Sequence, residues 1–166
     1  MPDDFFGNFL KARKEGAPAF FYWHGSSDPH RGYKKDSGIA AGKKLSDIDH
    51  VPAYWPDNDI VRGDMLNYSI EVERFDTHVG ELLADLEASG EAENTLVIVT
   101  SDHGMPFPRV KGHTFDDAHR VPLVMRWPVR ESRIRVAGLK NSSALSILPR
   151  PSSIFSKAIR KPWEWN

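Results

Sequence analysis

The chain has 166 residues, of which 40% are hydrophobic and 27% charged, and a formal net charge of −1 at pH 7. These values are ordinary for a globular protein and allow at most one modest domain. The absence of cysteine excludes disulfide bonds and thiolate metal sites. The near-neutral charge argues against a general surface for polyanions such as nucleic acids. No apolar run of about 18 residues is present, so no membrane span is predicted.

The first part of the chain predicts two helices and one strand. Residues 4–14 are expected to form a short helix, and the aromatic residues 19–23 a strand. Residues 26–59 contain several glycines and prolines and read as a long loop, which makes them a candidate substrate rim. Residues 64–90 carry apolar side chains at three- and four-residue spacing, which predicts an amphipathic helix.

The segment after this helix is the most informative. Residues 95–100 are apolar and β-branched and end abruptly at the polar turn Asp102-His103-Gly104. A second apolar run, 121–125, follows about one crossover later. The strand at 19–23, the helix at 64–90 and the strand at 95–100 are expected to form a βαβ unit with a right-handed crossover, as in a mostly parallel α/β sheet. Ligands of such sheets bind at the carboxyl ends of strands, so Asp102 and His103 are candidate site residues.

These motifs resemble those of the sulfatase family. The family carries a Ser-Asp-(Asn/His)-Gly turn, a basic residue nine positions after the aspartate, and an Arg-Val-Pro-Leu entry into the next strand. Here they correspond to residues 101–104, Lys111 and residues 120–123. The Met-Pro-Phe-Pro stretch at 105–108 looks like the sulfamidase branch, whose members hydrolyse heparan N-sulfate.

A second block agrees with this resemblance. The aromatic strand at 19–23 is followed by Asp-Pro-His-Arg at 28–31, as in the family. The resemblance covers roughly residues 1–128. It implies an alkaline-phosphatase-like catalytic domain with a mostly parallel sheet sandwiched by helices, of which this chain would be the C-terminal and incomplete part.

The resemblance also implies roles for individual residues. Asp102 and His103 would bind one Ca²⁺ ion, although imidazole is a poor ligand for so hard an ion and His103 could instead donate to the sulfate or the nucleophile. Lys111 would neutralise the sulfate oxygens as the S–O or S–N bond breaks, and His30 would donate to the sulfate or protonate the leaving group. Three further basic residues are expected to bind the substrate: Arg31, Arg109 and His113.

Each of these residues also has a plain structural interpretation. Asp102 fits a common turn, Lys111 fits a solvated loop, and His30 fits a bystander histidine. Tyr54 and Trp55 are suited to stacking on a sugar ring, but packing is the better interpretation of them. The adjacent Asp116 and Asp117 are expected to point apart and are not predicted to form a catalytic pair.

Sulfatases use a formylglycine nucleophile made from a Cys/Ser-x-Pro-x-Arg motif. The chain is interpreted as lacking this motif, and the nucleophile and the paired aspartates of the family are expected before Met1. The isolated chain is therefore expected to be inactive.

The composition changes after residue 128. Residues 129–166 contain eight Lys or Arg against two Glu, many serines and no clean period. Two explanations stay open: a frameshift that truncated the chain, and a disordered, mildly basic tail.

The sequence thus predicts a metal-assisted hydrolase of sulfate esters or sulfamates on sugars. The alternatives are a phosphodiesterase or phosphonate hydrolase of the same superfamily, and a non-catalytic remnant or binding module. Relatives are often exported, but nothing in these residues indicates a compartment.

Overall fold

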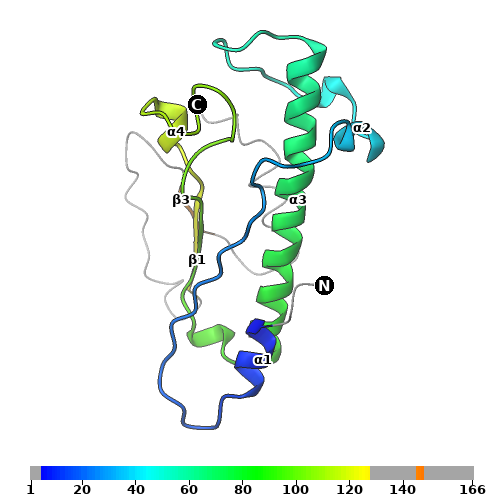
Figure 1. The fold of residues 1–166 in the computed structure, drawn as a ribbon. Helices are drawn as coiled ribbons and strands as arrows, with labels where there is room; N and C mark the ends of the chain where they lie inside the picture. Colours follow the sequence, from blue (N-terminus) through cyan, green and yellow to red (C-terminus); the bar gives the residue numbers. More distant parts are fainter. Residues whose placement is uncertain (1–4, 128–144, 148–166) are drawn as a thin grey trace.

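The computed structural model describes residues 5–127 and 145–147, in which one long helix stands beside a small sheet (Figure 1). The helix, α3, spans Asp59–Ala88. It begins where the Asn58 side chain accepts a hydrogen bond from the backbone N–H of Val61 at 3.0 Å, which satisfies a free N–H of the first turn. The helix predicted for 64–90 is therefore confirmed, and it starts earlier because Asn58 caps it.

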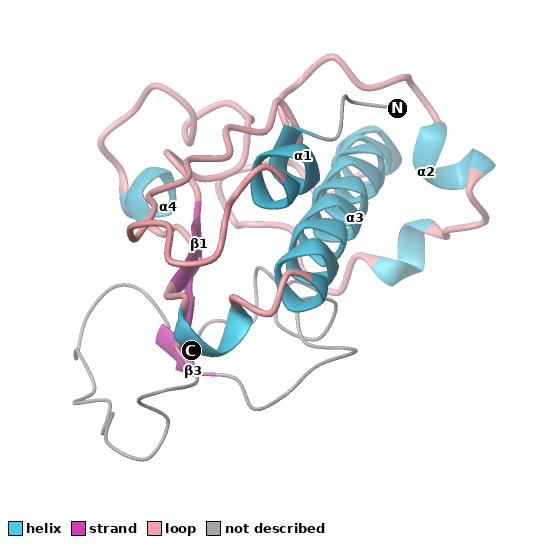
Figure 2. Cartoon of the chain, turned by 90° about the horizontal axis from the view of Figure 1, so that it is seen from below, coloured by secondary structure: helices cyan, strands magenta, loops and turns pink. Residues whose placement is uncertain are grey.

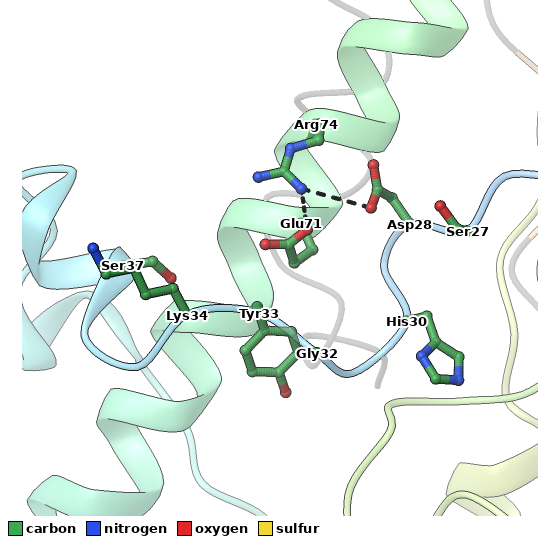
Figure 3. A pocket seen from close by; sticks show the side chains of 9 residues that line it. All are labelled: Ser27, Asp28, His30, Gly32, Tyr33, Lys34, Ser37, Glu71 and Arg74. Atoms are coloured by element: carbon green, nitrogen blue, oxygen red, sulfur yellow. Dashed lines mark hydrogen bonds and ion pairs between the residues drawn. The ribbon is translucent and has the colours of Figure 1, made fainter. Parts of the chain in front are cut away.

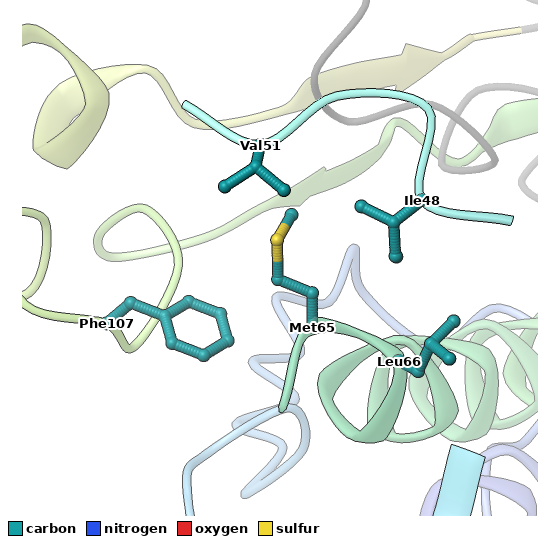
Figure 4. Close-up of a cluster of buried hydrophobic side chains, with 5 residues drawn as sticks. All are labelled: Ile48, Val51, Met65, Leu66 and Phe107. Carbon is teal, nitrogen blue, oxygen red and sulfur yellow. The ribbon is translucent and has the colours of Figure 1, made fainter. Parts of the chain in front are cut away.

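Two clusters of buried side chains lie along α3. The Met65 cluster joins the helix to two loops (Figure 4) and consists of Ile48, Val51, Met65, Leu66 and Phe107. The Leu86 cluster joins α3 to α1 (Phe5–Lys11) and to the 3₁₀ turn η2 (Ala92–Asn94), and consists of Phe6, Leu10, Leu86 and Ala92. Figure 2 shows α1 lying alongside α3. The helix predicted for 4–14 is thus confirmed, but it ends at Lys11.

Three short strands form the sheet in the order β1-β2-β3. β1 (Val97–Thr100) pairs antiparallel with β2 (Leu123–Arg126), and β2 pairs parallel with β3 (Leu145–Ile147). The two predicted strands therefore exist, but they pair antiparallel, so the expected mostly parallel sheet is not confirmed. The reason is their connection: residues 101–122 contain only the short helix α4 (Asp116–His119), so the chain turns back without a crossover helix.

Residues 19–23 do not form the predicted strand, although their side chains alternate as in one. Phe20 and Tyr22 pack on the aromatic rings of α1. Phe21 and Trp23 face outward and are 86% and 78% exposed. The alternation is present, but no described segment pairs with these residues to make a ladder.

The predicted loop at 26–59 contains two short helical turns, α2 (Ser37–Ala40) and η1 (Leu45–Asp47). It is held against α3 at Gly38, whose backbone N–H donates to Asn67 Oδ1 at 3.0 Å. A Cβ at position 38 would lie 2.6 Å from the Cβ of Leu66, so glycine permits an approach that other residues would block. The loop is therefore packed on the helix.

Within residues 5–127, no helix combines the length and the apolar character that a membrane crossing requires. The tail predicted for 129–166 lies outside the described residues, apart from the backbone of β3.

Candidate active site

The polar turn at 101–104 follows β1 and is docked on α4. The backbone N–H of Gly104 donates to the carbonyl of Ala118 at 3.0 Å. A Cβ on residue 104 would lie 2.0 Å from the carbonyl oxygen of Asp117 and 2.8 Å from Cγ1 of the buried Val110. The glycine of the Ser-Asp-His-Gly motif is thus required by close packing, which fixes the direction in which the turn leaves the strand.

Asp102 and His103 stand together at the surface of this turn. The side chain of Asp102 is 86% exposed, and its Oδ2 lies 3.7 Å from Nε2 of His103. Nδ1 of His103 lies 2.7 Å from the carbonyl oxygen of Gly104, which only accepts, so Nδ1 is the protonated nitrogen. The lone pair of neutral His103 is therefore on Nε2, on the side of Asp102. A backbone carbonyl orients metal-binding histidines in the same way.

These two residues do not by themselves make a calcium site. Ca²⁺ takes six to eight oxygen ligands, whereas Asp102 and His103 offer one carboxylate and one imidazole nitrogen. Among the described residues, no group of three or more acidic or histidine side chains lies in metal-binding proximity. The described donors therefore fit only part of such a site.

The loop at 105–113 carries three of the predicted basic residues. Phe107 anchors it in the Met65 cluster, and Val110 is completely buried. The carbonyl of Phe107 accepts from the backbone N–H groups of Val110 and Lys111 at 3.1 and 3.2 Å. Around these anchors, the side chains of Arg109, Lys111 and His113 are exposed. The backbone of the loop is thus anchored by buried side chains, while its basic side chains face the solvent.

The loop at 28–33 touches this basic loop through Arg31. The Arg31 guanidinium lies 5.5 Å from the centroid of the Phe107 ring. It also donates to Asp64 Oδ2 at 2.7 Å and to the hydroxyl of Tyr33 at 2.9 Å. Asp64 is the main cause that raises the pKa of Arg31, and burial raises the pKa of Tyr33 to about 12. Arg31 is therefore engaged in joining the loop to α3.

His30 is exposed at the edge of a hollow of about 580 Å³ beside α3 (Figure 3). Its Nδ1 lies 2.7 Å from the carbonyl oxygen of Arg31, and in Figure 3 its ring points away from Arg74. The hollow holds the carboxylates of Asp28 and Glu71, which lie 3.7 and 2.5 Å from Arg74. Its lining residues are Ser27, Asp28, His30, Gly32, Tyr33, Lys34, Ser37, Glu71 and Arg74.

The structure brings the two predicted loops together, since Arg31 contacts Phe107. No hydrogen bond or ion pair between His30, Asp102 and Lys111 is found in the described part of the chain. The convergence of these three side chains on one sulfate thus stays a prediction. His113 stacks on Phe115 with ring centroids 5.8 Å apart.

The sequence interpretation missed one motif and one contact. Residues 27–31, Ser-Asp-Pro-His-Arg, do fit the spacing Ser-x-Pro-x-Arg, so the statement that the chain lacks such a spacing is wrong. Ser27 lies in a loop, where its carbonyl accepts from the N–H of His30 at 2.8 Å. The missed contact joins Tyr54, whose hydroxyl donates to Asp117 Oδ2 at 2.5 Å. No local pattern signals a pair so distant in sequence.

Comparison with known proteins gives a family match over most of the chain. The model of the family described as Sulfatase matches residues 3–146. The chain is 35% identical over 79 residues to "Ulvan-active sulfatase" of Formosa agariphila, which covers 48% of this chain and 13% of that protein. It is 31% identical over 106 residues to "N-sulphoglucosamine sulphohydrolase" of Homo sapiens, covering 64% of this chain and 21% of that protein.

A third relative is "Iduronate 2-sulfatase" of Mus musculus, 37% identical over 78 residues, which cover 45% of this chain and 14% of that protein. The matched part of the chain thus spans about a fifth or less of the length of these relatives. No solved structure matches the chain significantly.

Proposed function

Because the chain belongs to the sulfatase family, whose model matches residues 3–146, we propose that it forms part of a hydrolase that cleaves sulfate groups from sugars. The family implies an alkaline-phosphatase-like α/β fold and a sulfuric ester hydrolase. The similarity to human N-sulphoglucosamine sulphohydrolase supports including N-sulfate beside O-sulfate among the proposed linkages.

One observation supports the proposal most strongly. The turn that bears Asp102 and His103 is packed through Gly104 against Val110, the buried residue between Arg109 and Lys111. A carboxylate, an oriented imidazole and two cations are thereby carried by neighbouring backbone segments that pack on each other. Such an arrangement suits an anion whose charge changes during a reaction, because nearby charges and dipoles stabilise the charge that develops as the bond breaks.

The residues of this chain would divide the work as follows. Lys111 would neutralise the sulfate oxygens, on which negative charge is concentrated. His30, an exposed imidazole on the neighbouring loop, would give a proton to the departing oxygen or nitrogen. Arg109 and His113 would bind the rest of the substrate. Arg31 would act mainly by holding the His30 loop on Phe107 and Asp64.

Two further components of the proposal come from the family. Asp102 and His103 would contribute to a Ca²⁺ site that polarises the sulfate, with its other ligands lying outside the described residues. A formylglycine would be the nucleophile in the intact enzyme. The described residues would supply only part of that calcium site.

A binding experiment tests the proposal on the 166-residue chain. Titration calorimetry would compare glucosamine N-sulfate with unsulfated glucosamine, and the sulfated sugar is expected to bind more tightly. Lys111→Ala should weaken its binding by about tenfold to a hundredfold, since a charged hydrogen bond contributes about 1.5–3 kcal/mol and 1.4 kcal/mol is one factor of ten.

Lys14→Ala is the matched control, because it removes the same charge from an exposed lysine just after α1. Equal binding of the two sugars, or equal weakening by both substitutions, would overturn the proposal. A preference for inorganic phosphate over sulfate as competitor would favour the related phosphodiesterases instead.

A further inference from the structure

Two aromatic rings lie against the guanidinium of Arg109, one from Tyr54 and one from Phe115. The guanidinium carbon lies 4.6 Å from the centroid of the Phe115 ring and 5.3 Å from that of Tyr54. Both distances are within the range of cation–π attraction. The Tyr54 hydroxyl is in turn fixed to Asp117 at 2.5 Å. These contacts join three separate segments of the chain around one cation.

The backbone of Arg109 adds to this picture. Its φ is 70°, in the left-handed region that residues with long side chains rarely adopt. Arg109 is the third residue of the turn closed by the Val110 N–H and the Phe107 carbonyl at 3.1 Å, a position that glycine usually occupies when φ is positive. Uncommon backbone conformations of this kind are kept where surrounding contacts impose them, and they gather at binding sites.

Arg109 also differs from most arginines of the described chain in its charge balance. Within residues 5–127, no carboxylate forms an ion pair with Arg109, and Asp117 is already bonded to Tyr54. Other arginines lie within 4 Å of a carboxylate, namely Arg13, Arg31, Arg62, Arg74 and Arg126. The planar fork of Arg109 is thus oriented by two rings but not neutralised, which suits it to a bidentate bond with an oxyanion.

We infer that Arg109, positioned by Tyr54 and Phe115, binds a second anionic group of the substrate, a sulfate or carboxylate on the sugar next to the one that is cleaved. This inference rests on the proposed function, in which Lys111 binds the sulfate that leaves. Phe115 is 48% exposed, and Arg109 and His113 both lie against its ring, so an aromatic surface adjoins the cation. Tyr54 and Phe115 are positioning residues, because they act through Arg109.

The test compares two sulfated disaccharides that differ by one anionic group. Titration calorimetry of the 166-residue chain would give the ratio of their dissociation constants. The disaccharide with two anionic groups is expected to bind about tenfold more tightly, the effect of one charged hydrogen bond. Arg109→Ala should bring the ratio close to one. Arg109→Lys, which keeps the charge but loses the fork, should recover only part of the ratio.

Tyr54→Phe distinguishes a role of Tyr54 in positioning Arg109 from a general role in stabilising the fold. It keeps the ring and removes the bond to Asp117, so the NMR signal of the Arg109 Nε–H group should shift and the ratio should fall while the thermal midpoint changes little. Lys35→Ala is the charge control and should leave the ratio intact. A ratio unchanged by Arg109→Ala would overturn the inference. Loss of selectivity for sulfate in Lys111→Ala tests the proposed function separately, since that readout does not involve the second group.

Discussion

Replacing Gly104 by alanine should dislodge the Asp102 turn from α4. The added Cβ would lie 2.0 Å from the carbonyl oxygen of Asp117, whereas real Cβ contacts stay above 3.0 Å, so the turn must move by about 1 Å. This movement breaks the bond from Gly104 to Ala118, worth about 1–1.5 kcal/mol, and strains the packing on Val110 by about 1–3 kcal/mol. The expected loss of unfolding free energy is about 2–4 kcal/mol.

Urea denaturation followed by tryptophan fluorescence would measure this loss. Gly80→Ala is the control, because no atom lies within 4 Å of its Cβ position in α3 and alanine there should stabilise the helix by about 1 kcal/mol. A loss below about 0.5 kcal/mol for Gly104→Ala, the level of ordinary surface substitutions, would refute the packing explanation of the turn.

Three further outcomes are expected. Burial raises the pKa of Asp76, whose Oδ1 has no hydrogen-bond partner among the described residues. The contribution of Asp76 to stability should therefore be most favourable below its unfolded pKa of about 3.9 and be lost as pH rises through its folded pKa. Asp76→Asn should flatten that decline, and a variant less stable than the parent at pH 7 would contradict it. Because Asp102 and His103 would supply only part of a Ca²⁺ site, the purified chain should not hydrolyse a chromogenic sulfate ester; turnover that disappears in Lys111→Ala or Ser27→Ala would show the opposite. A hydrophobic dye should bind the outward aromatic face, and replacing Phe21 and Trp23 by serine should reduce its fluorescence without lowering the thermal midpoint.

Local sequence patterns predicted where the helices and strands lie better than they predicted which strands pair and in which direction. The spacing of apolar residues located α3, and the β-branched runs located β1 and β2, because these signals reside in neighbouring residues. The direction of a strand depends on how the chain connects it to its neighbour. Residues 101–122 contain only the short α4, so β2 returns antiparallel to β1. The strand expected at 19–23 has the correct alternation but lacks a described neighbour, which no local pattern could reveal.

For the candidate site too, local motifs were found from the sequence, whereas contacts between distant residues were not. The family motifs located the Asp102 turn and the basic loop, and the packing of Gly104 gives a physical reason for one motif residue. The role of Arg31 in joining the loops depends on Asp64 and Phe107, which lie far from it in sequence. The bond of Tyr54 to Asp117 links residues 63 positions apart, beyond the reach of any turn or helix signal.

The length of α3 keeps the two clusters of buried side chains far apart, so each end of the helix has its own core. Leu66 and Leu86 belong to different clusters, and 20 helical residues between them span about 30 Å. The site loops are tied to the Met65 end through Phe107, whereas the aromatic rings of α1 are tied to the Leu86 end. Opening of the Leu86 end would therefore expose amides of α1 to hydrogen exchange while the Asp102 turn stays folded. Thermal unfolding of the Leu86 end and loss of ligand binding at the Met65 end are then expected to have different midpoint temperatures.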